Sequence, residues 1–520
     1  MFAKVHSAQT ALLQAQIISV EVDVAKGLHT FSIIGLPDKA VEEAKDRVAA
    51  AVKNSGFPSP KHSNQKVVVS LAPADLKKEG SAFDVAVALS YLLAVEAISF
   101  PVEGKLFLGE LSLDGGLRPI KGALPIAQAA KANGFSEIFL PHENAAEAAV
   151  LQGLTVFGAN TLSEIVDHLT SDNEEVKDGK KGVARLKRQV RTEIIHSDRA
   201  PEIDFASVVG QAAAKRGLEI AAAGGHNIAM YGPPGTGKSM LAKAFVGILP
   251  PLSFDEILEV TGIHSVSGML DGPYLTTPPF RSPHHTASYT ALVGGGTIPK
   301  PGEITLAHRG VLFLDEFPEF ERRVIDALRQ PLEDKVVSVS RVKGSARFPA
   351  EVILIAALNP CPCGNWGVAK KSCVCSPVNV NRYQRKIAGP IADRIDLWVE
   401  VANVDYEKLG RQEASGDKSS EIRNRVSAAR DRQRKRSQNC NIKAKTNSGV
   451  SAKDLAKVAP LSKEVQKTLN QSAEKLDLSA RSYHRVVKLA RTIADLEGSE
   501  ELTVPHILEA LQYRPKVRNL

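Results

Sequence analysis

The stretch that decides the fold is "GPPGTGKS", residues 232–239, which fills the pattern G-x-x-x-x-G-K-[ST]. An apolar run precedes it and a helical pattern follows it, as expected for a loop that joins a strand to a helix. Backbone N–H groups of such a loop and the positive end of the helix can cradle phosphate oxygens. Lys238 would add a charge at the β- and γ-phosphates, and the Ser239 hydroxyl would bind magnesium. The stretch therefore predicts a nucleotide site in an α/β core.

Two further strand ends carry polar groups suited to hydrolysis. "GVLFLDEFPEF", residues 310–320, predicts a buried strand that delivers Asp315 and Glu316 at its carboxyl end, where α/β sheets bind ligands. Asp315 is expected in the magnesium shell, and Glu316 is expected to orient and polarise the attacking water. Another strand, in "EVILIAALNP" at 351–360, ends at Asn359, which is expected to contact the water or the γ-phosphate. The residues expected to bind the nucleotide and its Mg²⁺ are Gly232, Pro233, Pro234, Gly235, Thr236, Gly237, Lys238, Ser239, Met240 and Asp315.

The length of 520 residues predicts about three domains around this core. Residues 1–168 alternate strand and helix patterns, and residues 169–200 are dominated by charge and predict a linker. Residues 201–402 show the βα alternation of a parallel sheet, and residues 403–520 are polar and helical.

Composition limits the cellular setting. A net charge of +8 permits an acidic partner such as nucleic acid without identifying one. No run of eighteen apolar residues predicts a membrane span, and the start lacks the pattern of a signal peptide. Five cysteines in 520 residues argue against a secreted disulfide scaffold. We expect a cytoplasmic protein.

The order of "GPPGTGKS", "GVLFLDE" and "LNP" resembles that of AAA+ ATPases. "IAGPIADRIDL" at 387–397 and "LSARSYHRVVKLARTIADLEG" at 478–498 are similar to the magnesium-chelatase-like branch. "FSIIGLPDKAVEEAKDRV" at 31–48 and "SLAPADLKKEGSAFDVAVAL" at 70–89 narrow the resemblance to the YifB/ComM family, over nearly the whole chain. The resemblance implies an α/β multidomain protein with a Lon-protease-like α+β domain, an AAA+ P-loop αβα core and a C-terminal helical lid.

The same resemblance implies roles for two arginines and an activity. Arg394 matches the arginine finger that one subunit offers to its neighbour's γ-phosphate, and Arg481 matches sensor two on the lid. A finger supplied in trans requires an oligomer, so a homohexamer using ATP and Mg²⁺ is implied. The implied activity is that of an ATP-driven DNA helicase that promotes branch migration in homologous recombination, as in natural transformation. The alternative is a chelatase-type remodelling ATPase that acts on a protein partner.

The resemblance also implies two inserts, which in this branch of AAA+ proteins lie near the central channel of the hexameric ring. Residues 288–310 match the helix-2 insert, and residues 334–360 match the pre-sensor hairpin. Alternation over 336–342 predicts a strand before the turn, and Arg341, Lys343 and Arg347 concentrate positive charge near its tip. We expect these three residues to contact DNA phosphates without reading bases. The alternative is an ordinary basic hairpin at the surface, and the basic stretch 428–438 is interpreted as a solvated helix face.

The N-terminal domain resembles the Lon-protease-like fold. Ser81 stands where peptidases of that fold carry their serine, but Leu124 occupies the position of the lysine. A serine hydroxyl without a base is a poor nucleophile, so we expect a non-proteolytic scaffold. The alternative is an active Ser81–Lys121 dyad, with Lys121 displaced by about one helical turn.

Four of the five cysteines fall in "NPCPCGNWGVAKKSCVCSP", residues 359–377. Four thiolates in two close pairs suit a tetrahedral structural Zn²⁺. Zinc sites more commonly use Cys-x₂₋₄-Cys spacing, so reduced packing cysteines and a redox centre stay open as alternatives. The predicted zinc ligands are Cys361, Cys363, Cys373 and Cys375.

Overall fold

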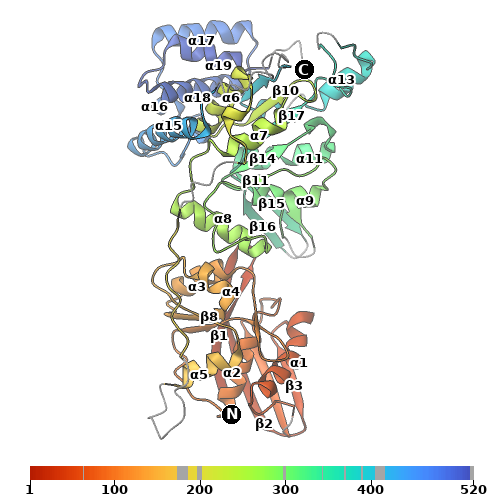
Figure 1. Cartoon of the computed structure of the whole chain (residues 1–520), viewed down its shortest axis with the longest axis vertical. Helices are drawn as coiled ribbons and strands as arrows, with labels where there is room; N and C mark the ends of the chain where they lie inside the picture. The colour runs from red at the N-terminus through yellow and green to blue at the C-terminus, as the bar shows by residue number, and fades with distance from the viewer. Residues whose placement is uncertain are drawn as a thin grey trace. The chain divides into compact units, whose positions relative to one another are not determined.

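The structure is a computed structural model that describes residues 1–61, 64–171, 185–195, 202–296, 300–341, 344–367, 371–387, 391–403 and 416–515 (Figure 1). Side chains at 340, 341, 344 and 345 are also outside the description. The chain forms two compact units. Unit 1 comprises Met1–Ile195 and Phe254–Thr276, and unit 2 comprises His196–Ser253 and Thr277–Leu520.

Unit 1 is built on a four-stranded sheet of order β1-β2-β4-β3. β1 pairs with β2 and β2 with β4 in antiparallel register, whereas β3 runs parallel to β4. Strict alternation along β2 buries Ile18, Val20 and Val22 on one face, against which α2 packs. The elements are β1 (Phe2–Ala11), β2 (Gln14–Lys26), β3 (Thr30–Ile34), α1 (Lys39–Asn54), β4 (Gln65–Ala72) and α2 (Asp84–Ala94).

The second half of unit 1 is a parallel three-stranded sheet of order β5-β8-β9, with a short hairpin, β6 and β7. Its elements are β5 (Lys105–Phe107), β6 (Glu110–Leu111), β7 (Leu117–Arg118), α3 (Ala123–Ala132), β8 (Glu137–Pro141), α4 (His142–Ala148), β9 (Thr155–Ala159) and α5 (Leu162–Thr170). The sequence predicts a linker over residues 185–195, but this segment runs alongside the edge strand β9. The Gln189 N–H donates to the Val156 carbonyl at 2.8 Å, because the edge of β9 offers unpaired backbone groups.

A helix from much later in the chain completes unit 1. α8 (Phe254–Ser267) packs on α3 and buries Ile257, Val260 and Ile263. The sequence-based division placed residues 254–276 in the ATPase core, and the structure assigns them to unit 1. The physical reason is this apolar face together with the Ser265 hydroxyl, which accepts a hydrogen bond from the Gly122 N–H at 3.0 Å.

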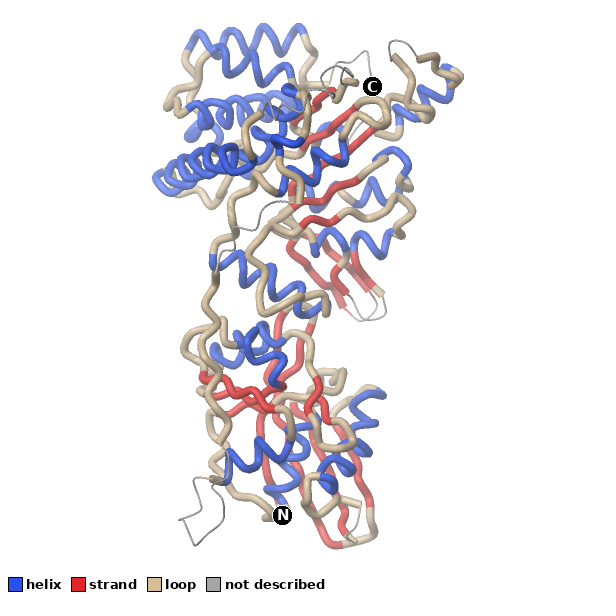
Figure 2. Tube along the Cα trace, in the orientation of Figure 1, coloured by secondary structure: helices blue, strands red, loops and turns tan. Residues whose placement is uncertain are grey.

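Unit 2 contains a five-stranded sheet of order β11-β14-β17-β10-β18 in which every neighbouring pair is parallel. Figure 2 shows these strands with helices on both sides. The strands are β10 (Ile228–Tyr231), β11 (Phe280–Arg281), β14 (Val311–Leu314), β17 (Ile353–Leu358) and β18 (Leu397–Glu400). β14 and β17 are continuous apolar runs buried along their whole length, as central strands covered on both faces must be.

The helices and short elements around this sheet come from the connections between strands. They are η1 (Phe205–Ser207), α6 (Ala212–Gly224), α7 (Lys238–Val246), α9 (Tyr289–Val293), β12 (Gly294–Gly295), β13 (Lys300–Pro301), α10 (Glu303–Leu306), η2 (Phe317–Glu319), α11 (Arg322–Ala327), α12 (Arg329–Asp334), α13 (Pro377–Arg385) and η3 (Ala392–Arg394). α6 packs on β10 and β18, and α7 packs on β17.

The predicted hairpin before the Asn359 strand is confirmed. β15 (Val336–Arg341) pairs antiparallel with β16 (Gly344–Pro349). Val337, Val339 and Phe348 are buried on one face, whereas Arg347 is exposed. Lys343 and the side chain of Arg341 lie outside the described residues.

The C-terminal part of unit 2 is helical, as expected. Its elements are α15 (Ser419–Asn439), η4 (Asn447–Gly449), α16 (Leu455–Val458), α17 (Lys463–Lys475), α18 (Ala480–Glu497) and α19 (Val504–Gln512). The basic stretch 428–438 lies on α15 and is less solvated than interpreted: Arg430 donates to the Ala222 carbonyl and Arg432 to the Asp495 carbonyl. These arginines hold α15 against α6 and α18.

None of the helices in the described ranges combines the length and apolar character needed to cross a membrane.

Candidate nucleotide site and cysteine cluster

The loop between β10 and α7 has the backbone shape that its glycines allow. A Cβ at Gly232 would lie 2.1 Å from the Val401 carbonyl oxygen, so this position has no room for a side chain. Gly235 and Gly237 adopt φ angles of +80° and +89°, which other residues rarely adopt. The loop therefore leads directly into the first turn of α7, whose N–H groups have no partner within the helix.

Lys238, the first residue of α7, is buried and turned back onto its own loop. Its Nζ donates to the carbonyls of Gly232 at 2.8 Å and Pro233 at 2.7 Å, and lies 3.2 Å from Asn359 Oδ1. Burial lowers the pKa of Lys238 to about 8, and the nearby charge of Asp315 opposes this shift. The structure thus brings the loop lysine and the amide at the end of β17 into contact.

The first turn of α7 also meets the end of β14. The Ser239 hydroxyl donates to Asp315 Oδ2 at 2.7 Å, and the Glu316 N–H donates to Asp315 Oδ1 at 2.9 Å. Magnesium prefers oxygen ligands and is commonly held by one or two protein groups together with substrate phosphates. The Ser239 and Asp315 oxygens fit that role.

Glu316 has an unusual backbone and a partner that the sequence analysis missed. Its φ and ψ of 49° and 43° are left-handed, a conformation that costs free energy and clusters at functional sites. Its Oε2 lies 3.1 Å from Nδ1 of His285. The only sequence signal for this contact is the His284–His285 pair soon after β11, the strand that neighbours β14.

The two arginines implied by the resemblance meet at one carboxylate. Arg394 Nη2 lies 2.7 Å from Glu333 Oε2, and Arg481 Nη2 lies 2.9 Å from Glu333 Oε1. Arg394 is only 7% exposed, whereas the Arg481 side chain is half exposed. Burial raises the pKa of Glu333, but the arginines outweigh it and the net shift is downward. No sequence pattern pointed to Glu333, because the contact joins three distant elements.

The four clustered cysteines come together as predicted from their spacing. Their ligand atoms all lie within 4.8 Å of one another, with Sγ–Sγ distances of 3.3 Å for Cys361–Cys363, 3.6 Å for Cys361–Cys373 and 3.5 Å for Cys363–Cys373. Sulfurs on a tetrahedral Zn²⁺ at about 2.3 Å would be about 3.8 Å apart. Disulfide sulfurs lie at about 2.05 Å, so these cysteines are free thiols.

Backbone donors also suit a thiolate cluster. The Trp366 N–H donates to Cys361 Sγ at 3.3 Å. N–H groups of Asn365 and Val374 lower the pKa of Cys363 to about 6, which favours the metal-binding thiolate. Backbone N–H groups act in the same direction on Cys373 and Cys375, but burial and the neighbouring cysteines outweigh them and raise the pKa of both, as expected when several thiols share one site. The donor set therefore fits Zn²⁺.

The cysteine loop borders the nucleotide loop. A Cβ at Gly364 would lie 2.5 Å from Pro234 Cδ, so the two loops touch. Tyr383 of α13 is buried beside Asn359 and Cys361, and this burial raises its pKa. A change in the cysteine loop would therefore act directly on the wall of the nucleotide site.

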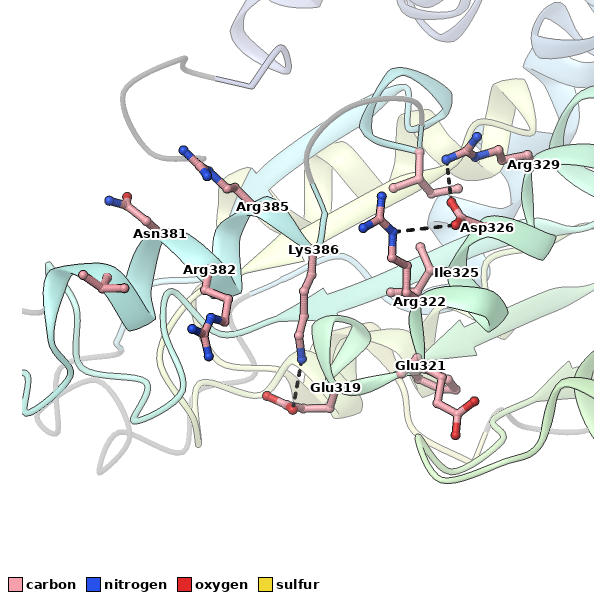
Figure 3. Close-up of a pocket in the computed structure, with 13 residues that line it drawn as sticks. Glu319, Glu321, Arg322, Ile325, Asp326, Arg329, Asn381, Arg382, Arg385 and Lys386 are labelled. Carbon is pink, nitrogen blue, oxygen red and sulfur yellow. Dashed lines mark hydrogen bonds and ion pairs between the residues drawn. The ribbon is translucent and has the colours of Figure 1, made fainter.

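A pocket of about 990 Å³ lies between the η2–α11 segment and α13 (Figure 3). Asp326 pairs with Arg329 at 2.5 Å and with Arg322 at 3.9 Å, and Lys386 lies 3.8 Å from Glu319. Three acids and five cations line it: Glu319, Glu321, Asp326, Arg322, Arg329, Arg382, Arg385 and Lys386. The sequence analysis did not identify this mixed-charge pocket.

The serine and lysine of the Lon-like comparison have separate partners. The Ser81 hydroxyl donates to Glu110. Lys121 packs over Gly268, where a Cβ would lie 2.7 Å from Lys121 Cε. Leu124 is fully buried in α3. A dyad would need a contact between Ser81 and Lys121, and neither of these contacts brings the two side chains together.

The phosphate loop follows β10, Asn359 follows the adjacent strand β17, and Asp315 and Glu316 follow β14 on the other side of β17. This arrangement defines the class: unit 2 is an AAA+ core. The family described as magnesium chelatase, subunit ChlI, matches residues 204–409. Subunit ChlI of Mg-chelatase matches residues 20–144, and its C-terminal family matches residues 416–514.

Full-length relatives narrow this class. The chain is 39% identical to competence protein ComM of Haemophilus influenzae over 521 residues, covering 100% of this chain and 98% of ComM. It is 40% identical to YifB of Salmonella typhimurium over 514 residues, covering 98% and 97%. The chain belongs to the YifB/ComM family of magnesium-chelatase-like proteins. A match to Lon protease 2 of Bacillus subtilis, 29% identical over 101 residues, covers 19% of the chain.

Proposed function

We propose that the chain is an ATP-driven DNA motor that acts as a homohexamer and promotes branch migration in homologous recombination. One observation supports this proposal most strongly. At the carboxyl ends of the parallel strands β10, β17 and β14, five residues lie together: Lys238, Ser239, Asp315, Glu316 and Asn359. The full-length relative is named competence protein ComM, which supports a role in natural transformation.

Each residue at these strand ends has a distinct task in ATP hydrolysis. Lys238 binds the β- and γ-phosphates after leaving its loop carbonyls. Ser239 and Asp315 would hold Mg²⁺, which would supply charge that neutralises the phosphates. Glu316 orients a water for in-line attack on the γ-phosphorus, which breaks the bond to ADP and releases inorganic phosphate. Asn359 contacts the γ-phosphate or that water.

Arg481 and Arg394 complete this chemistry by supplying positive charge to the loose transition state. In this proposal Arg481 acts within its own subunit and Arg394 acts on the neighbour's nucleotide. Arg394 is buried against Glu333, so it must move before it can reach another subunit.

The β15–β16 hairpin is proposed to contact DNA phosphates through Arg341, Lys343 and Arg347. The exposure of Arg347 and the buried opposite face of the hairpin support this role. Such contacts are salt-dependent and independent of base sequence.

Cys361, Cys363, Cys373 and Cys375 are proposed to hold a structural Zn²⁺ that fixes the loop beside Pro234. Their close thiolates and backbone donors support this role.

The decisive experiment measures ATP hydrolysis with single-stranded, duplex and four-way DNA, beside the oligomeric state. We expect branched DNA to stimulate hydrolysis and to be resolved. Lys238→Ala should abolish both activities, and Glu316→Gln should slow hydrolysis about 10²–10⁴-fold. If no DNA stimulates hydrolysis and no DNA is resolved, the DNA-motor proposal is wrong, and a remodelling ATPase that acts on a protein is favoured.

A further inference from the structure

Glu333, at the end of α12, lies where three elements of unit 2 meet. One of its oxygens pairs with Arg394 of η3 and the other with Arg481 of α18. A single negative charge therefore holds two positive charges, and the two arginines are those assigned to two different nucleotides.

A second ion pair joins α18 to the segment between η3 and β18 and is more buried. Arg485, one turn after Arg481 on α18, lies 2.5 Å from Asp396, two residues after Arg394. The Asp396 and Arg485 side chains are 9% and 16% exposed, whereas those of Glu333 and Arg481 are 36% and 50% exposed. Buried pairs are costly to break and exposed pairs are weak. The Asp396–Arg485 pair is therefore suited to fix α18, and the Glu333–Arg481 pair is suited to open.

We propose that Glu333 is a positioning residue that holds Arg394 and Arg481 away from phosphate in the nucleotide-free subunit. This inference rests on the proposed ATPase function. A bound γ-phosphate, which carries more negative charge than one carboxylate, draws Arg481 from Glu333 while Asp396 keeps α18 in place. A neighbour's nucleotide draws Arg394 as well, but the Arg394 side chain is only 9% exposed, so its pair with Glu333 is costlier to break than that of Arg481.

Sharing one carboxylate makes the two departures depend on each other. Each arginine repels the other, so the departure of one strengthens the remaining pair. A subunit therefore releases its sensor and its finger one at a time, which favours alternation between binding its own nucleotide and assisting its neighbour.

The test uses the full chain with Glu316→Gln, so that nucleotide binds without turnover. Fluorescent ATP and ADP analogues are titrated with and without Glu333→Gln. We expect the preference for ATP over ADP to rise about two- to fivefold, the range of exposed ion pairs. In an Arg481→Ala background, Glu333→Gln should leave the preference unchanged. Asp334→Asn removes an exposed charge from the next position of the same helix and should leave the preference unchanged.

The outcomes distinguish a failure of the proposed ATPase function from a failure of the role proposed for Glu333. A Glu316→Gln protein that binds no nucleotide would reject the proposed function itself. Binding with a preference that falls or stays constant in Glu333→Gln would instead show that Glu333 is a fixed brace. A rise that persists in the Arg481→Ala background would also contradict the release of that arginine.

The Arg394 contact is tested in mixed oligomers. Subunits with Lys238→Ala cannot use nucleotide but still present a finger to wild-type neighbours. Adding Glu333→Gln to these subunits should raise hydrolysis per wild-type site, and further adding Arg394→Ala should remove the rise. An unchanged rate in the first mixture would show that Glu333 does not restrain the finger.

Discussion

Ser239 donates a hydrogen bond to Asp315 across the mouth of the sheet, at 2.7 Å. The two proposed magnesium ligands therefore lie together although they are 76 residues apart in the chain. The helix start and the strand end are held by buried packing, so the oxygens are placed before any ion arrives. Magnesium demands near-ideal geometry, which such preorganisation supplies.

Ser239→Ala should raise the Mg²⁺ concentration that half-maximal ATP hydrolysis requires, because one oxygen ligand is lost. We expect a shift of about tenfold, the lower end of effects seen on removing groups that support a metal. Ser239→Thr keeps the hydroxyl and should behave as wild type. Hydrolysis titrated with Mg²⁺ at fixed ATP gives the answer, and an unchanged midpoint in Ser239→Ala would remove Ser239 from the shell.

His285→Ala should raise ATP hydrolysis in the absence of DNA, because Glu316 loses the partner that restrains it. An exposed pair of this kind restrains by at most about 1 kcal/mol, so the rise should be about two- to fivefold. His284→Ala tests the neighbouring ring, since His284 hydrogen-bonds to Thr286 and packs on His285 with ring centroids 4.1 Å apart, and its effect should be smaller. A decrease in His285→Ala would indicate that the imidazole assists Glu316 in hydrolysis.

Cys373→Ser should remove zinc from a protein that otherwise carries about one zinc per chain, measured by elemental analysis. Because Gly364 contacts Pro234, loss of the metal should also weaken ATP binding. Cys440→Ser is the control, as Cys440 stands outside the cluster. Metal-free wild-type protein with full ATPase activity would contradict a structural zinc.

Asp84, at the start of α2, should make the stability of unit 1 depend on pH. Burial raises its pKa from 3.8 to about 6 despite a bidentate contact from Arg47 at 2.8 and 3.1 Å. The folded state therefore holds the proton more tightly than the unfolded state does. This group's contribution, about 3 kcal/mol in full, is present below about pH 4 and is lost as the pH rises through 6.

The isosteric variant Asp84→Asn isolates this effect, since an amide does not titrate. Both tryptophans, Trp366 and Trp398, lie in unit 2, so tryptophan fluorescence does not report on unit 1. Hydrogen exchange of α1 and α2 is therefore the suitable probe. From pH 5 to 7.5, wild-type protection should fall by about 1 kcal/mol relative to the variant. A constant difference between the two proteins would show that Arg47 keeps Asp84 ionised throughout.

Local sequence rules were sufficient for the central parts of unit 2. The glycine spacing around Lys238 specifies a strand–loop–helix turn, and the apolar runs before Asp315 and Asn359 specify buried parallel strands. The close pairs of cysteines likewise limit how far their sulfurs can separate. These features depend on neighbours in sequence, which a pattern can report.

Contacts between distant segments were not predictable in this way. His285 reaches Glu316 because β11 lies beside β14, and Glu333 meets its arginines only after the helical region has packed. The apolar face of α8 resembles that of any core helix, so the pattern could not say which unit it covers. The burial of Arg394 also depends on tertiary packing, and its role in trans stays a prediction.

The passage of the chain through α8 has a consequence for biosynthesis. Unit 1 needs Phe254–Thr276 for completion, so the ribosome must first make residues 196–253, which belong to unit 2. At 5–20 residues per second, roughly, α3 waits several seconds for the helix that covers it. A nascent chain that ends before residue 254 exposes this apolar surface, which makes that interval the stage at which chaperones would be needed most.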